Sequence, residues 1–131
     1  MPPAEGMKNT PLPKGKGPGD GDQLIYQLRI FTDYPGRRDA HVNRFREHTC
    51  RLLEKHGIKI IGCWVTATEE HQDQVVFITA HESYEAMRAA QASFASDPEQ
   101  NAMVRDSEKD GKIIEHSDNW YLQPVDFSPL H

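Results

Sequence analysis

Four runs of β-branched and aromatic residues alternate with amphipathic stretches along this sequence, and their order limits the folds that the chain can adopt. The strand-like runs cover residues 23–32, 58–66, 74–80 and 112–122. The helix-like stretches cover residues 37–56 and 83–94, and a shorter helix begins near residue 96. β-branched and aromatic residues favour strands, whereas apolar residues spaced three and four apart favour helices. The order strand, helix, strand, strand, helix, strand predicts an α+β fold of the ferredoxin-like, split βαβ kind.

The helical stretches carry start and stop signals. Gly57 follows the first stretch and predicts its end, because glycine readily adopts the backbone conformation that terminates a helix. Ser96 and Glu99 have the spacing of a capping box, which predicts the start of the short helix. The first stretch also has an apolar stripe that should face the sheet, made of Val42, Phe45, Thr49, Leu52 and Leu53.

The chain of 131 residues divides into a tail and one domain. Residues 1–22 hold five of the nine glycines, five of the nine prolines and no aromatic residue. Such a segment buries too little apolar surface to offset its ordering entropy, so we expect a disordered tail. Residues 23–131 are long enough for a single domain with its own core.

Apolar side chains on both faces of the central strands predict a second copy of the chain. In the split βαβ arrangement, both helices lie on one face of a four-stranded antiparallel sheet. Residues 58–66 and 74–80 would still present apolar side chains on the opposite face. Because a bare apolar face of this size is unfavourable in water, we expect a homodimer that packs sheet against sheet.

Composition disfavours several other classes of partner. The formal net charge of −5 argues against nucleic acid. No apolar run approaches the roughly 18 residues of a membrane-spanning helix, so no membrane partner is expected. Two cysteines, Cys50 and Cys63, suit a reducing compartment and predict a cytoplasmic protein with inert thiols.

No cofactor or metal ion is predicted. Phosphate-binding loops, nucleotide fingerprints and closely spaced cysteine or histidine pairs are absent from the sequence. His41 and His48 share a helix face, but seven residues place them about 10 Å apart along the axis, too far to ligate one ion.

Several short motifs, in order, resemble the NIPSNAP family. They lie at residues 26–32, 35–36, 45–49, 55–58, 61–64, 97–99 and 126–130. The family usually carries an aromatic residue where this chain has Cys63. The resemblance implies a dimeric α+β barrel, and it implies no particular chemistry because the family has no single established activity. The wider superfamily includes cofactor-free monooxygenases, isomerases, lactone-forming or decarboxylating enzymes and some haem proteins.

His48 is a candidate for proton transfer. It follows Phe45 by three residues and precedes Leu52 by four, so we expect its ring beside the buried stripe, facing the space between helix and sheet. Two interpretations remain open. The imidazole either forms a hydrogen bond at the margin of the core or acts as an acid or base near neutral pH.

Arg29 and Tyr26 are the other candidate catalytic residues. A buried arginine in mid-strand needs an anionic partner, which is either an interface carboxylate, such as Glu115 or Asp118, or the carboxylate or enolate of a substrate. Tyr26 is either a core residue or a hydrogen-bond donor to a substrate carbonyl. One cavity lined by His48, Arg29 and Tyr26 would favour an enzyme, although regular strand alternation places Tyr26 and Arg29 on opposite faces.

Five further residues are expected to bind the substrate, mostly as flat apolar walls. They are Trp64, Phe45, Phe77, His116 and Trp120.

Two functions remain. The first is a cofactor-independent enzyme, such as those of secondary metabolism, that isomerises, cyclises or rearranges an apolar or aromatic small molecule by acid–base catalysis. The second is a non-catalytic homodimer that binds a ligand or serves as a scaffold.

Overall fold

In the computed structural model, which describes residues 24–130, strands and helices follow the predicted order. The predicted disordered tail, residues 1–22, lies outside the described residues. The elements are β1 (Ile25–Asp33), α1 (Arg38–Arg44), the π-helix η1 (Phe45–Thr49), α2 (Cys50–Lys55), β2 (Lys59–Val65), the 3₁₀-helix η2 (Glu69–His71), β3 (Gln74–His81), α3 (Tyr84–Ala95), α4 (Pro98–Ser107) and β4 (Ile114–Leu122).

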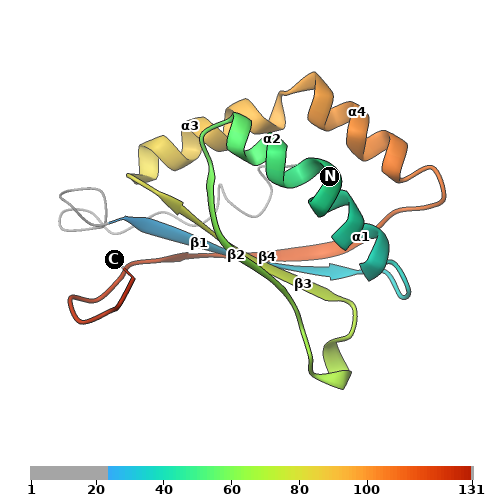
Figure 1. Ribbon diagram of the computed structural model, residues 1–131, viewed down its shortest axis with the longest axis horizontal. Coiled ribbons are helices and arrows are strands. Elements are labelled where there is room, and N and C mark those ends of the chain that lie inside the picture. The colour runs from blue at the N-terminus through green and yellow to red at the C-terminus, as the bar shows by residue number, and fades with distance from the viewer. Residues whose placement is uncertain (1–23, 131) are drawn as a thin grey trace.

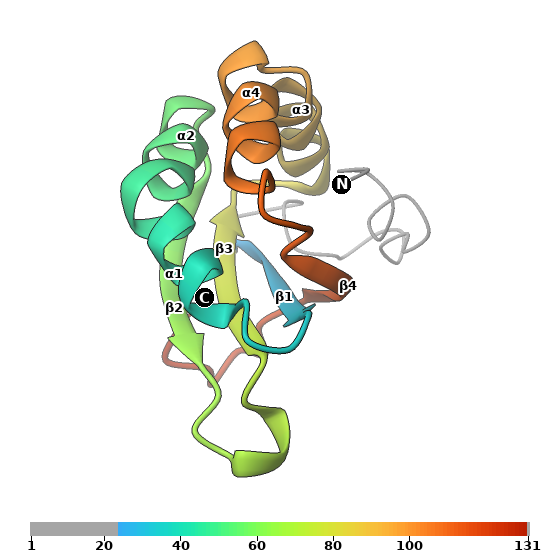
Figure 2. The same ribbon diagram turned by 90° about the vertical axis from the view of Figure 1, so that its right-hand side faces the viewer.

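The four strands form one antiparallel sheet in the order β2-β3-β1-β4. Helices α1 to α4 all cover the same face of this sheet (Figure 1), and the perpendicular view shows the two layers (Figure 2). This arrangement confirms the predicted α+β fold with a four-stranded antiparallel sheet. The predicted pairing of the second and third strands as antiparallel neighbours is also confirmed.

The first helical stretch is continuous in space but contains a π-helical turn. The segments α1, η1 and α2 follow one another without a break from Arg38 to Lys55. Within η1 both end residues, Phe45 and Thr49, are buried. Gly57 ends the stretch with a φ of 77°, and the backbone N–H of Ile58 then donates to Leu53 O, as the sequence predicted for a glycine stop.

The core lies between the helices and the sheet. Its central cluster comes from β1, η1, α2, the α2–β2 connection and β3, and consists of Phe31, Phe45, Leu53, Ile58, Val75 and Phe77. Phe45 packs edge-on against Phe77, with ring centroids 5.1 Å apart. The apolar stripe of the first helical stretch therefore faces the sheet as predicted.

The predicted capping box at α4 is wrong. Asp97, not Ser96, caps the helix and accepts a hydrogen bond from the backbone N–H of Glu99. The Ser96 hydroxyl donates to the preceding turn of α3 instead. Asp97 also joins α4 to the end of α2, because His56 Nε2 lies 2.6 Å and Lys55 Nζ 2.9 Å from its Oδ2. These contacts hold the pKa of the Asp97 carboxyl well below its usual range.

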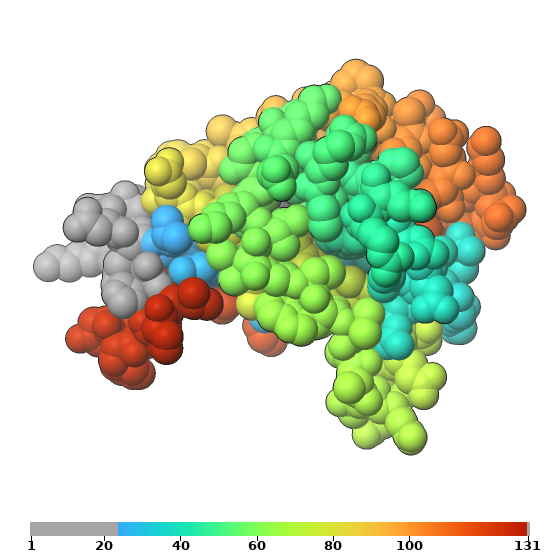
Figure 3. All heavy atoms as spheres, in the orientation of Figure 1, coloured from blue at the N-terminus to red at the C-terminus, as the bar shows by residue number. Residues whose placement is uncertain are grey.

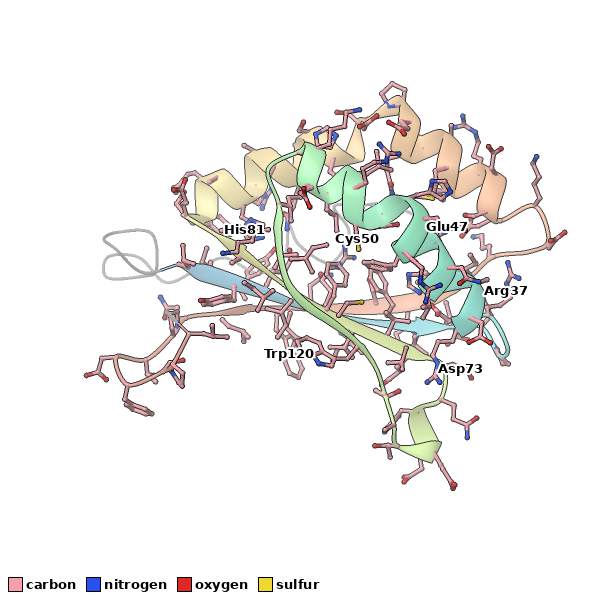
Figure 4. All side chains as sticks on the ribbon, in the orientation of Figure 1. Arg37, Glu47, Cys50, Asp73, His81 and Trp120 are labelled. Carbon is pink, nitrogen blue, oxygen red and sulfur yellow. The ribbon has the colours of Figure 1, made fainter. Side chains whose placement is uncertain are left out.

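The sheet face opposite the helices is open. Trp64 and Trp120 are 51% and 57% exposed, and Trp120 extends away from the helices (Figure 4). The β2–β3 connection and the C-terminal segment both drop below the sheet (Figure 1), and the connection forms a protruding lobe (Figure 3). Within residues 24–130, no helix is both long and apolar enough to span a membrane.

Candidate functional site

A cavity of about 310 Å³ lies between the helices and the sheet. Its apolar walls come from β1, η1, β3 and α3, through the aromatic rings of Phe31, Phe45, Phe77 and Phe94. Polar side chains of β1, β3, α3 and α4 complete the lining. Cavities of this size, with apolar walls and polar groups at defined positions, are typical of small-molecule sites.

The buried pair of Asp33 and His41 lies at one end of this cavity. Asp33 is the last residue of β1 and His41 lies in α1. The imidazole Nδ1 is 2.9 Å from both carboxylate oxygens of Asp33, and the two side chains are 1% and 0% exposed. A carboxylate in this position accepts the Nδ1 proton and thereby fixes the tautomer of the ring.

The second imidazole nitrogen is left available to a ligand. His41 lines the cavity, and its Nε2 makes no hydrogen bond with any residue of the described chain. Its ring packs against Phe31 and Phe45, with centroid distances of 5.0 and 5.4 Å. In the neutral tautomer that carries its proton on Nδ1, Nε2 has a free lone pair, and the two phenyl rings hold the imidazole in place.

Arg29 extends from the middle of β1 into the same cavity. Its Cζ lies 4.7 Å from the centroid of the Phe31 ring, and its Nη2 donates a long hydrogen bond of 3.4 Å to Ser117 Oγ. The buried Nε has no partner among the described residues. Burial lowers the pKa of the guanidinium to about 10, the effect expected where no carboxylate compensates for lost water.

The other end of the cavity is formed by amide and imidazole side chains. Gln27 donates to Asn119 Oδ1 and accepts from Gln91 Nε2. His81 Nε2 lies 2.8 Å from Thr79 Oγ1, and burial lowers the pKa of His81 to about 4. This histidine, on the helix side of β3 (Figure 4), is therefore neutral at physiological pH.

The structure brings together three of the eight predicted site residues. Arg29, Phe45 and Phe77 line the cavity. His48 is exposed and lies outside it, in a shallow depression that also involves Glu47. The expectation that the His48 ring faces the space between helix and sheet is therefore wrong, because His41, seven residues earlier, occupies that position.

The remaining predicted residues lie on the open face of the sheet. Since Gln27, Arg29 and Phe31 line the cavity, alternation turns Tyr26 to the other face. The same alternation places Trp120, which is paired with Leu28, on that open face. Trp64 and His116 also lie on the open face and do not line the cavity. The opposite faces that strand alternation predicts for Tyr26 and Arg29 are confirmed, so these two residues do not share one cavity, and Tyr26 is buried.

Sequence reasoning missed the Asp33–His41 pair. Asp33 lies just beyond the predicted strand at residues 23–32, although it is the last residue of β1. His41 was considered only as a metal ligand, yet it precedes Phe45 by four residues and so extends the buried stripe by one turn. That spacing was the available signal. Within the described part of the chain, no three His, Cys, Asp or Glu side chains form a metal-binding group.

Comparisons with known proteins identify relatives of this chain. The sequence matches no curated protein. A NIPSNAP family protein from Agrobacterium tumefaciens shares 25% identity over 83% of this chain and 100% of its own, with a TM-score of 0.74. A NIPSNAP-like domain protein from Burkholderia xenovorans shares 22% identity over 83% of this chain and 91% of its own, also with a TM-score of 0.74.

A more distant structure has a related fold. It is a putative antibiotic biosynthesis monooxygenase from Chloroflexus aurantiacus, with 14% identity and a TM-score of 0.52 over 83% of this chain and 100% of its own. At this identity the likeness concerns the fold alone. The sequence model of NIPSNAP matches residues 26–129, which include every helix and nearly every strand residue. The chain therefore belongs to the NIPSNAP family.

Proposed function

We propose that this protein is a cofactor-independent enzyme that binds an apolar or aromatic small molecule in the cavity and transfers a proton on it. The observation that carries the proposal is the buried Asp33–His41 pair, because it engages Nδ1 and leaves the other imidazole nitrogen unpaired in a residue that lines a cavity with aromatic walls. A base that is oriented by a third group and faces a ligand cavity is the usual arrangement of general-base catalysis.

The proposed chemistry uses His41 as base and Asp33 as its positioning residue. His41 Nε2 accepts a proton from a carbon next to a substrate carbonyl, and the electron pair of that C–H bond forms the enolate. The imidazolium then returns the proton to another carbon or to the oxygen, so the net reaction is an isomerisation or the first step of a cyclisation. Asp33 stabilises the imidazolium through Nδ1.

The cavity walls support this chemistry. Phe31 and Phe45 hold the imidazole between them, so it loses little freedom when a substrate binds. Apolar walls also exclude water, which strengthens the electrostatic interactions of a developing enolate. Arg29 adds a cation to the cavity lining, and its guanidinium lies over the same Phe31 ring.

Proton exchange in D₂O tests this proposal without knowledge of the natural substrate. The probes are enolisable aryl ketones such as 2-tetralone, and deuterium incorporation is followed by NMR. We expect His41→Asn and Asp33→Asn to lower the protein-catalysed rate by roughly 10²- to 10⁴-fold. His71→Asn is the matched control, because His71 is exposed in η2, away from the cavity.

The same assay decides between the alternatives. If His48→Asn abolishes exchange and His41→Asn does not, the sequence-based assignment of the base is right and the proposal for His41 is wrong. If wild-type protein binds the ketones without accelerating exchange, the protein is a non-catalytic ligand-binding module. Circular dichroism of each variant distinguishes loss of fold from loss of the base.

We also propose that two copies of the chain pack through the open sheet face. Trp64 and Trp120 expose large apolar surfaces there, and Phe127 in the C-terminal segment is 83% exposed. A two-fold partner would cover these side chains. Light scattering should give a dimer for wild type, a monomer for Trp120→Asp and a dimer for the control Lys109→Asp, whose side chain is 77% exposed beyond α4. A wild-type monomer at micromolar concentration would contradict this assembly.

We propose a cytoplasmic location for this protein as well. Both cysteines, Cys50 and Cys63, are free thiols whose pKa values are raised by burial. Unpaired, unreactive thiols suit a reducing compartment. Fractionation of cells that express the protein would test this location.

A further inference from the structure

We propose that the ligand of this cavity is an organic anion, an aromatic or apolar carboxylate whose carboxylate group binds Arg29. This inference names the substrate class for the proposed function and rests on it. It depends on the charges that line the cavity, on the hydrogen bonds that Arg29 lacks, and on the position of Arg29 relative to His41.

The side chains that line the cavity include more positive than negative charges. Three arginines, Arg29, Arg44 and Arg105, line it, whereas no Asp or Glu among residues 24–130 does. This distribution is local, because the whole chain has a formal net charge of −5. An anionic ligand would therefore meet a favourable potential inside an otherwise acidic protein.

The nearby carboxylates are already engaged elsewhere. Asp33 binds His41, and Glu108 lies 3.8 Å from Arg44. Within the described chain, Arg29 forms no salt bridge, and the one side chain that raises its pKa electrostatically is the phenol of Tyr121, not a carboxylate. A desolvated guanidinium without a carboxylate partner lowers the stability of the folded protein. A carboxylate of the ligand would supply that partner.

The hydrogen-bonding edge of Arg29 is also incomplete. Nε is buried and has no partner, and Nη2 makes only the 3.4 Å contact with Ser117. Nε and Nη2 together form the edge that binds both oxygens of a carboxylate through two parallel hydrogen bonds. A lysine at this position would offer a point charge but not this paired geometry.

The contacts of Arg29 and His41 with Phe31 indicate where the apolar part of the ligand would lie. Arg29 and His41 both flank the ring of Phe31, at 4.7 Å for the guanidinium carbon and 5.0 Å for the imidazole centroid. A carboxylate on Arg29 therefore brings the adjoining carbons of the ligand towards His41. The phenyl rings of Phe45 and Phe77 line the same space and would contact a flat hydrocarbon group.

The test compares a carboxylate with its neutral amide of the same shape. The probes are 2-naphthoate and 2-naphthamide, and calorimetry at pH 7.5 gives the two dissociation constants. The measured quantity is the ratio of the amide constant to the carboxylate constant. We expect wild type to prefer 2-naphthoate, and Arg29→Met to lower the ratio at least about tenfold, because a charge-assisted hydrogen bond is lost.

Two further variants make the result decisive. Arg46→Met is the matched control, since Arg46 is exposed and bonds only to Asn43 among the described residues, and it should keep the wild-type ratio. Arg29→Lys should lower the ratio because it keeps the charge but loses the paired geometry. If Arg29→Met binds neither probe, the ratio of Arg29→Lys decides.

Specific outcomes overturn the inference. It is wrong if wild type shows no preference for 2-naphthoate or if the ratio is unchanged in the Arg29 variants. The proton-exchange assay uses a neutral ketone, so the carboxylate preference and the base chemistry are separate measurements. Either can fail while the other succeeds.

Discussion

Replacing Arg29 by methionine is expected to make the folded protein more stable. Burial lowers the pKa of this guanidinium from its ordinary value to about 10. Each pKa unit corresponds to about 1.4 kcal/mol, so holding the charge in the fold costs roughly 3 kcal/mol. The contact with the Phe31 ring and the long bond to Ser117 offset about 1–2 kcal/mol of this cost. Methionine keeps much of the apolar stem without the charge, which leaves an expected gain of about 1–2 kcal/mol in the free energy of unfolding.

Guanidinium chloride titration followed by circular dichroism measures this change. Arg46→Met, at an exposed position, is the control and should change the free energy of unfolding by less than about 0.5 kcal/mol. A loss of more than about 1 kcal/mol in Arg29→Met would show that Arg29 contributes to the fold through its contacts, and the argument from desolvation would be refuted. A gain in stability together with lost carboxylate binding is the pattern expected of a functional residue.

Three other changes test the fold. Leu52→Ala empties a site that is 0% exposed and should cost about 2–5 kcal/mol in denaturant titration, with a cost below about 1 kcal/mol contradicting the packing described. His56 holds the pKa of the Asp97 carboxyl below its unfolded value of 3.8. The Asp97 carboxylate therefore stabilises the fold at pH values above 3.8, and this stabilisation is lost as the pH falls from 3.8 towards the folded pKa. Asp97→Asn should therefore lose less stability than wild type on acidification, and parallel pH profiles would contradict this. Gly62→Ala places a Cβ within 2.5–3.2 Å of three Trp64 ring atoms, so the indole N–H signal of Trp64 should shift in NMR spectra, and an unmoved signal would contradict the close approach.

Sequence periodicity predicted the fold because each element has one dominant signal. The first strand was expected at residues 23–32 and is found at Ile25–Asp33, and the third was expected at 74–80 and is found at Gln74–His81. In both, β-branched and aromatic residues leave no competing pattern. The cap of α4 was misplaced because Ser96 and Asp97 are both good capping residues, and the choice depends on the contact of Asp97 with His56, which is distant in sequence.

The candidate site was harder to predict because it depends on which face of its strand or helix each side chain occupies. Arg29 was identified correctly as a cation that enters the interior, since a charged residue in an apolar strand is conspicuous. His48 was chosen for its spacing to Phe45 and Leu52, and His41, four residues before Phe45, has an equally good helical position. The partner that distinguishes them, Asp33, lies at the end of β1, and no local pattern indicates that its carboxylate reaches α1.

The π-helical turn makes the site depend on the number of residues in the chain as well as on their identity. The segment η1 stands between His41 and Leu52 and holds one more residue per turn than an α-helix would. If these residues formed a regular α-helix with no residue removed, α1 would be rotated by about 100° relative to α2. Every side chain of the site would still be encoded, yet His41 would turn away from Asp33. Alignments of relatives that differ by one residue in this turn therefore need a gap at η1 before their histidines can be compared.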